Sequence, residues 1–339
     1  MMNKKDILKS FLKFMLISLI GIVLATFGFD LKGEQNTTDC GEGKKGTEHR
    51  CNCGGNLSGG QKGQVSEPDS GQVEIQEMIY RNEPHFRVKT PHTMWYIEKS
   101  SGGASSLVDV DGKDWINFSK SNIPGKTNFA DSEFRGLPNL VFKDPGNGIG
   151  HPGFDVCQTR QVNDNELLVV SNNHQWQLRW IFFPGYAIVK IEDFDPGRKY
   201  WFLYEGTVAG NFDPSNHYWG TGKDGKRTDS PSIFKRPEKG LWDYAFFGSN
   251  GVNRTLFLSQ LTPDKNTDFF AYMGNNYKKD NASDDGMNVF GFGRSLDTQP
   301  LLEGENAFCV GFFPGEILTK QDENALNAHI TSIRKTYPK

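Results

Sequence analysis

Histidine, tyrosine, arginine and asparagine gather in the middle of the chain, in polar stretches between apolar runs. Aromatic faces cover the apolar C–H faces of sugar rings, and planar donors such as arginine and asparagine bind hydroxyls and carboxylates. This combination favours a saccharide site. The residues concerned fall in four blocks: 134–139 together with 151–153, then 172–176, 204–207 and 216–219, the last with Lys223, Lys226 and Arg227 close behind.

One reaction needs these residue types together, namely β-elimination at a uronic acid. An arginine, an asparagine or a metal neutralises the sugar carboxylate, so that the neighbouring proton becomes acidic. A tyrosine, histidine or lysine removes that proton, and an acid, often tyrosine, protonates the leaving oxygen. We therefore predict four catalytic residues: Arg135 as the neutralising group, and His151, His174 and Tyr218 for proton transfer.

A second set of polar and aromatic residues is predicted to bind the substrate. Asn139 and Arg227 would help to hold the carboxylate, whereas Lys223, Lys226 or Arg294 could accept a sulfate group. The complete set of predicted substrate-binding residues is Asn139, Tyr204, Glu205, His217, Trp219, Lys223, Arg227 and Arg294.

Each of these residues also has an ordinary structural explanation. Arg135 could pair with Glu133 or Asp131, and His151 could be a loop histidine before proline. His174 could be a turn residue at the start of a strand. Tyr204 lies in an apolar run that suits a core, and Tyr218 with Trp219 could serve packing alone.

Other catalytic classes have weaker support. Residues 220–227 nearly match a phosphate-binding loop, but Arg227 replaces the required serine or threonine and no helix follows. Glycosidase chemistry needs two opposed carboxylates, and nothing singles out a pair among Glu205, Asp213, Asp224 and Asp243. No nucleophile-elbow or zinc-protease motif is present. We predict no metal site and no cofactor, with a divalent cation such as calcium as the one open option.

The elements that must position these residues look like strands. Short apolar runs separated by Gly, Pro, Asn and Asp predict β-strands and hairpins. A helical pattern appears only after Thr319, with Leu326, Ile330 and Ile333 at i, i+4 and i+7. We predict a large antiparallel β-sandwich with a short C-terminal helix. The expected strands cover 94–97, 105–110, 114–118, 166–170, 176–183, 186–191, 200–204, 254–261, 287–292 and 307–313.

The first 29 residues of the sequence indicate export. Four lysines before residue 14 precede an uncharged apolar stretch, 14–29, as in a signal peptide. An uncleaved membrane anchor is the alternative, because no clear cleavage site follows. Residues 30–75 lack hydrophobic periodicity and are predicted to be a flexible linker, which leaves 76–339 as the catalytic β-sandwich. We expect a periplasmic or cell-surface location.

Cysteine usage and charge limit the partners. Cys40, Cys51 and Cys53 lack a well-spaced fourth zinc ligand, so in an oxidising compartment a local disulfide is the plainer interpretation. Cys157 and Cys309 lie in strand-like surroundings and are expected to be buried or paired. The formal net charge is -3, without the basic excess that is typical of nucleic-acid-binding proteins, so we predict no nucleic-acid partner. An anionic saccharide must be held by local cations instead.

Several of these segments resemble a known group of proteins. The run 102–116 resembles the opening strands of galactose-mutarotase-like supersandwich domains, which occur in several polysaccharide lyases. Phe134-Arg-Gly-Leu-Pro-Asn139, His151-Pro-Gly153, 200–207 and Asn288-Val-Phe-Gly-Phe-Gly-Arg294 resemble exported proteins of bacteria that degrade marine polysaccharides. The resemblance covers residues 85–315. It implies an ulvan lyase or an ulvan-oligosaccharide dehydratase, both of which act by elimination at a uronate.

The sequence thus predicts a carbon–oxygen lyase acting on an anionic algal polysaccharide or its oligosaccharides. Two other classes remain as alternatives: an exported glycan-binding protein without catalytic activity, and a glycoside hydrolase.

Overall fold

The computed structural model describes residues 73–118, 136–144, 148–150, 157–172, 174, 176–194, 196–233, 235–274, 286–297 and 299–337. All of them belong to one compact unit of the chain, Gln64–Lys339. The predicted signal sequence and nearly all of the predicted linker, with Cys40, Cys51 and Cys53, lie outside the described residues. Within the described ranges, no helix has the length and apolar character needed to cross a membrane.

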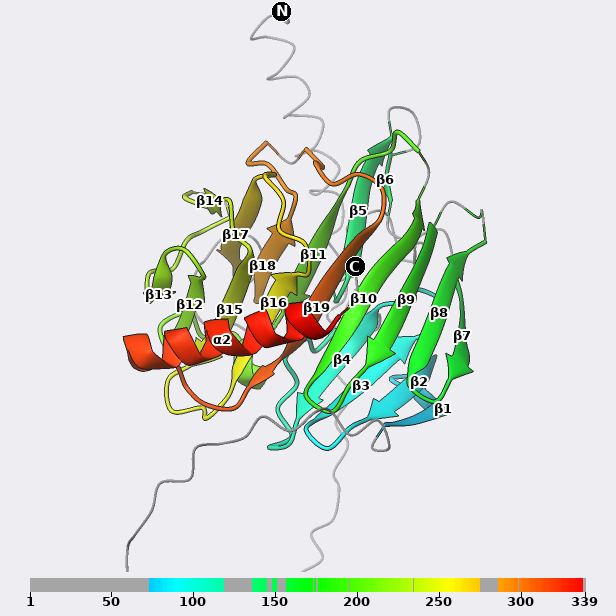
Figure 1. Ribbon diagram of the computed structural model, residues 1–339, viewed down its shortest axis with the longest axis horizontal. Coiled ribbons are helices and arrows are strands. Elements are labelled where there is room, and N and C mark those ends of the chain that lie inside the picture. Colours follow the sequence, from blue (N-terminus) through cyan, green and yellow to red (C-terminus); the bar gives the residue numbers. More distant parts are fainter. Residues whose placement is uncertain are drawn as a thin grey trace, which may run out of the picture. The chain divides into compact units, whose positions relative to one another are not determined.

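Strands form three antiparallel sheets (Figure 1). The first contains four strands that follow one another in chain order. Its strands are β1 (Glu74–Tyr80), β2 (Glu83–Lys89), β3 (Thr93–Glu98) and β4 (Ala104–Asp109).

The second sheet has nine strands, in the order β13-β12-β15-β16-β19-β10-β9-β8-β7. The chain therefore builds one side of this sheet from a hairpin series, β7 to β10, and the other from later strands. Their bounds are β7 (Cys157–Asn163), β8 (Glu166–Ser171), β9 (Trp176–Phe182), β10 (Tyr186–Phe194), β12 (His217–Thr221), β13 (Gly225–Arg227), β15 (Tyr244–Ser249), β16 (Thr255–Gln260) and β19 (Asn306–Phe313).

The third sheet has six strands, in the order β14-β17-β18-β11-β5-β6. Strand β11 lies near its middle, between β18 and β5, and carries the predicted site residues Tyr204 and Glu205. The bounds are β5 (Asn139–Asp144), β6 (Gly148–Gly150), β11 (Tyr200–Gly206), β14 (Glu238–Gly240), β17 (Asp268–Met273) and β18 (Met287–Phe292).

A large hydrophobic core fills the space between the nine-stranded and six-stranded sheets. Phe202 and Tyr204 of β11 and Phe290 of β18 share this core with Phe247 and Phe308 of the other sheet. Because successive side chains of a strand point to opposite faces, the residues between them on β11 face away from this core. They belong to a second apolar cluster with β17 and β18. Strands β11, β17 and β18 of the six-stranded sheet are thus buried on both faces.

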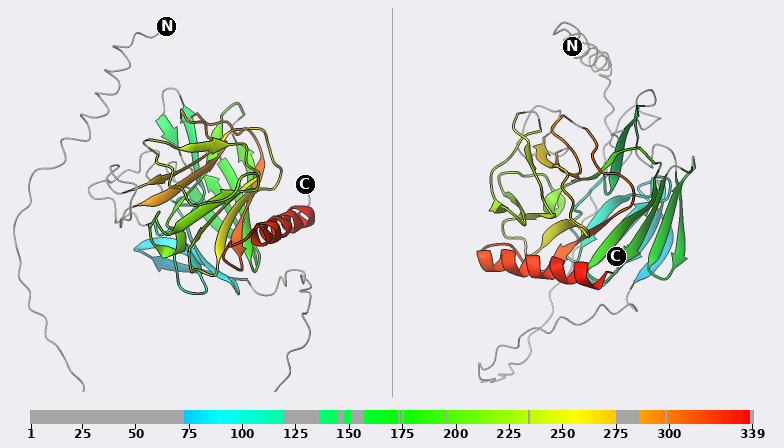
Figure 2. Two further views of the ribbon diagram at one scale, coloured as in Figure 1. Left: turned by 90° about the vertical axis from the view of Figure 1, so that its left-hand side faces the viewer. Right: turned by 45° about the horizontal axis from the view of Figure 1, so that its top comes forward.

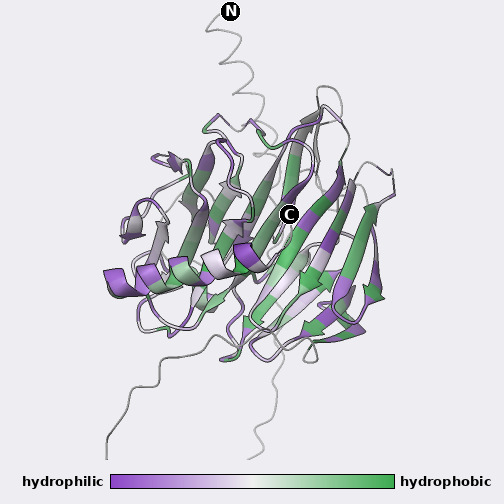
Figure 3. Ribbon diagram, viewed as in Figure 1, coloured by the Kyte–Doolittle hydropathy of each residue, from purple (hydrophilic) through white to green (hydrophobic). Residues whose placement is uncertain are grey.

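Helix α2 (Lys320–Thr336) covers the outer face of the nine-stranded sheet (Figures 1 and 2). Thr319 caps its N-terminus in a capping box with Asp322, so the helix begins directly after Thr319, where the sequence pattern placed its start. Leu326, Ile330 and Ile333 pack in a cluster with strand residues such as Phe257. The helix presents a largely hydrophilic face outward, above hydrophobic bands of the strands (Figure 3).

The predicted all-β sandwich with one C-terminal helix is confirmed. Nine of the ten expected strands exist, with ends shifted by up to three residues, but the tenth, 114–118, is wrong. There the Asp114 carboxylate accepts the backbone N–H groups of Leu107, Ile116 and Asn117, which holds a turn rather than a strand. Cys157 and Cys309 are both buried.

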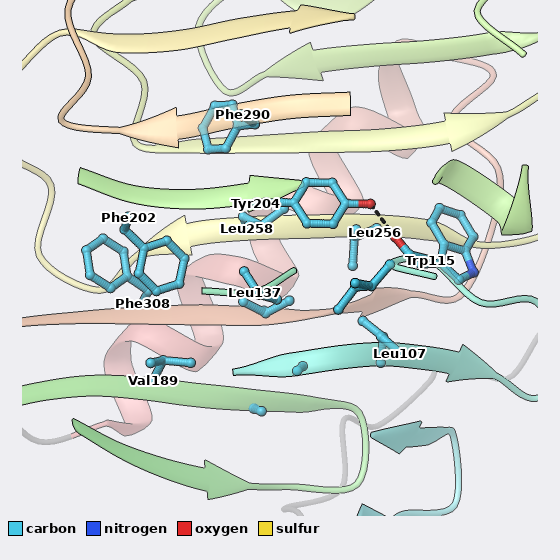
Figure 4. Packing of buried hydrophobic residues seen from close by; sticks show 14 of the residues in the cluster. Leu107, Trp115, Leu137, Val189, Phe202, Tyr204, Leu256, Leu258, Phe290 and Phe308 are labelled. Atoms are coloured by element: carbon cyan, nitrogen blue, oxygen red, sulfur yellow. Dashed lines mark hydrogen bonds between the residues drawn. The ribbon is translucent and has the colours of Figure 1, made fainter. Parts of the chain in front are cut away.

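Tyr204 shows how the core satisfies a buried hydroxyl (Figure 4). Its side chain is fully buried, and its hydroxyl donates a 2.6 Å hydrogen bond to the backbone carbonyl of Trp115. The sequence offered Tyr204 as a substrate-binding residue, with a core position as the alternative. The structure places it in the core.

Replacing Tyr204 with phenylalanine therefore tests a packing role. The Trp115 carbonyl would lose its donor inside the core, so we expect the free energy of unfolding to fall by about 1–3 kcal/mol. Chemical denaturation of Tyr204→Phe beside the wild type measures this. An unchanged free energy of unfolding would show that the hydrogen bond contributes nothing.

Candidate functional site

The outer face of the six-stranded sheet, away from the main core, brings three predicted site residues together. On β11, Trp201, Leu203 and Glu205 alternate with the core residues and point to this face. Asn139, the first residue of β5, lies directly opposite Leu203 in the strand register. Its Nδ2 atom donates a 3.0 Å hydrogen bond to Oε2 of Glu205. Strand pairing thus joins residues 66 positions apart in sequence.

Arg294 reaches the same face from the turn after β18. A Cβ atom at Gly291 would lie 3.2 Å from Cδ1 of Leu203 and 3.4 Å from Cβ of Arg294, so the glycine leaves room for the arginine. The guanidinium carbon lies 4.3 Å from the ring centre of Phe269 and 5.2 Å from that of Trp201. Two aromatic rings therefore hold the cation by cation–π contacts.

A buried carboxylate fixes the turn that carries Arg294. Asp268 accepts the backbone N–H groups of Gly293 and Trp242, each at 2.9 Å. Gly293 has φ 66°, a conformation that glycine adopts without strain. Asp268 therefore acts as a positioning residue, because it anchors the backbone immediately before Arg294.

The electrostatics of Arg294 reflect its burial. Desolvation lowers its pKa to about 10, and the negative charge of Glu205 opposes that shift. Arg294 therefore remains a cation at neutral pH. The exposed fractions of Arg294 and Glu205 are 9% and 8%, and Asn139 is fully buried. The face thus combines a cation, a carboxylate and an amide with aromatic walls.

Three polar atoms on this face lack a protein hydrogen-bond partner: Oδ1 of Asn139, Nε of Arg294 and Nε1 of Trp201. A buried polar atom without a partner costs about 1–3 kcal/mol, so native proteins rarely leave several together. Such atoms commonly mark the place where a ligand or water binds. Here they offer two donors and one acceptor, which suits a hydroxylated anion.

We searched the described residues for side chains that could bind a metal ion together. No group of three histidine, cysteine, aspartate or glutamate side chains there is arranged to hold an ion.

Tyr218 is separated from this face by the whole sandwich, and Trp219 by the six-stranded sheet. Tyr218 packs under α2 on the outer face of the nine-stranded sheet, where its hydroxyl hydrogen-bonds the Thr255 hydroxyl and accepts the backbone N–H of Ile317. Lys226 lies 4.0 Å from its ring centre. Trp219 points into the main core instead. The structure therefore does not bring the predicted acid–base Tyr218 to Asn139, Glu205 and Arg294; it gives Tyr218 a packing position.

Two further predicted cations lie at the edge of the nine-stranded sheet. Arg227 is already paired with the carboxylates of Asp229 and Glu238 at 2.7 and 3.1 Å, and its guanidinium stacks over Trp219. These carboxylates raise its pKa against the opposing effect of burial. Lys223 lies exposed in the adjoining turn. A substrate carboxylate at Arg227 would have to compete with two existing partners.

The predicted histidines take different positions. His174 is exposed in the turn between β8 and β9 and has φ 56°, so its backbone supports the alternative of a turn residue. His217 is buried inside the sandwich, on the opposite side of the six-stranded sheet from Glu205. Arg135 and His151 lie outside the described residues.

Sequence analysis missed Trp201, Phe269 and Asp268. The first could have been found, because alternation along 200–206 places Trp201 on the same face as Glu205. Phe269 and Asp268 belong to β17, a strand that the sequence analysis did not predict. Nothing local indicates that Asp268 would anchor a distant turn.

No protein-family model matches the sequence, and no curated protein is found related to it. Among solved structures, the chain is similar to HI1317, with a TM-score of 0.49 and 12% identity over 71% of this chain and 96% of that one. YeaD from Salmonella typhimurium, provisionally described as a mutarotase, gives 0.47 and 12% over 74% and 95%. A galactose mutarotase related enzyme from Lactobacillus acidophilus gives 0.45 and 7% over 70% and 99%. At these values the likeness concerns the fold, and the activities belong to those proteins.

Asp268 leads to a prediction about pH. Burial raises its pKa from 3.8 to about 8, with smaller contributions from the charges of Asp264 and Asp243, while the N–H donors of Gly293 and Trp242 oppose the shift. Between pH 4 and pH 8 the folded state therefore holds a proton that the unfolded state has released. The free energy of unfolding should fall as pH rises through this window, by up to about 1.4 kcal/mol per pH unit.

Asp268→Asn removes this titration. Its denaturation curves, measured from pH 4 to pH 8, should show a smaller decline than those of the wild type, so that the two free energies converge as pH rises. Two parallel profiles would contradict the assigned protonation.

Proposed function

We propose that the chain acts on an acidic saccharide at the outer face of the six-stranded sheet, by β-elimination at a uronic acid. One observation carries the proposal. Three predicted residues from separate strands and turns, Asn139, Glu205 and Arg294, meet on one face, where buried polar atoms lack protein partners. An ulvan-type substrate agrees with the sequence resemblance.

Each residue has a role that its chemistry suits. Arg294 would bind the uronate carboxylate and offset negative charge that builds up on it during the reaction. Asn139 would orient the sugar through its amide. Trp201 offers an indole N–H and an apolar ring edge to the sugar. Sulfate could compete for Arg294, as the sequence analysis proposed.

The elimination moves one proton and one leaving group. A base takes the C5 proton, the electrons of that C–H bond form the C4–C5 double bond, and the C4–oxygen bond breaks. The leaving oxygen then takes a proton and departs as a sugar hydroxyl or as water. Glu205 is the group on the described part of this face that can accept a proton, and His151 remains the candidate base from the sequence.

Location and partners complete the proposal. The protein would be exported to the periplasm or cell surface, by a signal peptide or with an N-terminal tether. It would bind an anionic saccharide and need no cofactor, with calcium as an option. Local cations such as Arg294 would attract the substrate, since the net charge is only -3.

A non-catalytic saccharide-binding protein is the second candidate. It is favoured by the content of the outer face, which carries neither histidine nor tyrosine among the described residues of β5, β11, β17 and β18. Such a protein would hold its ligand without converting it.

Glu205→Gln separates the two candidates. The glutamine oxygen can still accept the Asn139 hydrogen bond, while the proton acceptor is lost. If Glu205 is the base, turnover should fall by about 10²–10⁴-fold, with little change in saccharide affinity. The measurement is the ultraviolet absorbance of unsaturated uronate, released from ulvan and other uronate polymers and oligosaccharides.

Glu192→Gln is the matched control. Glu192 also accepts a side-chain amide, from Gln177 at 3.0 Å, but it lies on the nine-stranded sheet beside Arg179. Its replacement should leave turnover unchanged.

Product analysis decides among the reactions. Loss of one water from an intact oligosaccharide identifies a dehydratase, and chain scission with the chromophore identifies a lyase. New reducing ends without the chromophore would instead indicate a hydrolase. Saturable binding without any product would sink the elimination and leave the binding protein.

A further inference from the structure

A second set of polar side chains lies on the inner side of the six-stranded sheet. His217 points inward from β12, and Tyr272 and Asn288 face it from β17 and β18. Their exposures are 2%, 1% and 0%. None belongs to the outer face described above, because the sheet itself separates the two sets.

The strand register and the ring contacts place the three side chains together. Tyr272 and Asn288 are direct cross-strand partners, so their side chains stand next to each other on one face. The rings of His217 and Tyr272 have centres 6.3 Å apart. Phe212 packs against both rings. Its ring centre lies 6.4 Å from that of His217 and 5.8 Å from that of Tyr272, so it forms an aromatic wall.

None of the side-chain polar atoms of this set has a hydrogen-bond partner in the protein. The atoms are Nδ1 and Nε2 of His217, the hydroxyl of Tyr272, and Nδ2 and Oδ1 of Asn288. Tyr204 contrasts with them, since its hydroxyl in the same core is bound to the Trp115 carbonyl. Five buried polar atoms left unpaired at one place would cost more than a marginally stable fold readily tolerates.

The set is uncharged at neutral pH. Burial lowers the pKa of His217 to about 4, and the opposing influence of Asp213 is smaller. Burial also raises the pKa of Tyr272. A neutral imidazole, a phenol and an amide each offer both donors and acceptors. A hydroxyl group, which donates and accepts at once, complements all three, whereas a charged ligand would find no opposite charge on these side chains.

We propose that His217, Tyr272 and Asn288 form an internal binding site for uncharged hydroxyl groups. The hydroxyls belong either to water molecules held inside the sandwich or to a small neutral saccharide or polyol. The inference does not depend on the proposed function, since it concerns other residues and another side of the sheet.

The sign of the stability change in Tyr272→Phe tests the site. If the hydroxyl is bonded to a ligand or water, its removal loses that bond and lowers the midpoint of thermal unfolding. If the hydroxyl is unpaired, its removal relieves a buried polar group and raises the midpoint. A midpoint that rises or stays the same overturns the proposal.

Two comparisons make the result interpretable. Tyr204→Phe, which removes a hydroxyl with a known protein partner, shows how large a fall the loss of one bond causes in this core. Asn288→Leu should also lower the midpoint, because the same hydroxyls lose a second partner.

Two measurements on the wild-type protein identify the source of the hydroxyls. A bound saccharide or polyol adds its mass to the intact protein under non-denaturing conditions and appears in the supernatant after denaturation. Water alone leaves the polypeptide mass, and a high-resolution crystal structure then shows ordered oxygens within hydrogen-bonding distance of the three side chains. Either result supports the site. If the protein shows no added mass and the crystal structure shows no ordered oxygens beside the three side chains, the proposal is overturned.

Discussion

Strand β11 is buried along its whole length, on both faces of the six-stranded sheet. Its side chains alternate between two apolar environments, so a polar group placed on it is costly to bury without a hydrogen-bond partner. Tyr204 does so through Trp115 on one face, and Glu205 does so through Asn139 on the other. Asn139 is placed to meet this requirement, because it begins the neighbouring strand opposite Leu203, within hydrogen-bonding distance of Glu205.

The same constraint makes the unsatisfied atoms informative. Two buried acidic side chains elsewhere are well satisfied: Asp109 accepts the indole N–H of Trp115 and two backbone N–H groups, and Asp268 accepts two more. Single unpaired atoms such as Nε of Arg87 and Nε2 of His329 also occur, whereas each of the two polar sets gathers three or more. Polar atoms left without protein partners on both sides of one sheet are therefore better explained by ligands than by poor packing.

Much of the architecture follows from local sequence patterns, whereas the arrangement of the site does not. The run 254–261 and the helix after Thr319 were predictable from apolar periodicity and capping. Strands β15 and β17 were not predicted, although β16 is buried along its whole length in the same way and was. Sequence reasoning could also group Tyr218 with Arg294, because a run of letters does not show which face of a sheet each side chain occupies. Adjacent residues such as Tyr218 and Trp219 point to opposite faces of β12. Only the place of β12 in the sheet, beside β15, decides which of these faces meets helix α2.

The charges of the side chains distinguish the ligands that we propose for the two polar sets. The outer set keeps Arg294 charged beside two aromatic rings, and its Nε atom has no hydrogen-bond partner in the protein. The acidic sugar that we propose as the substrate would supply the missing acceptor together with a compensating charge. The inner set has no cation, because burial keeps His217 neutral. A carboxylate bound there would lose its hydration without gaining an opposite charge. The proposed uronate would therefore find an opposite charge on the outer face, whereas the inner set offers only neutral donors and acceptors, which suit the proposed hydroxyl groups.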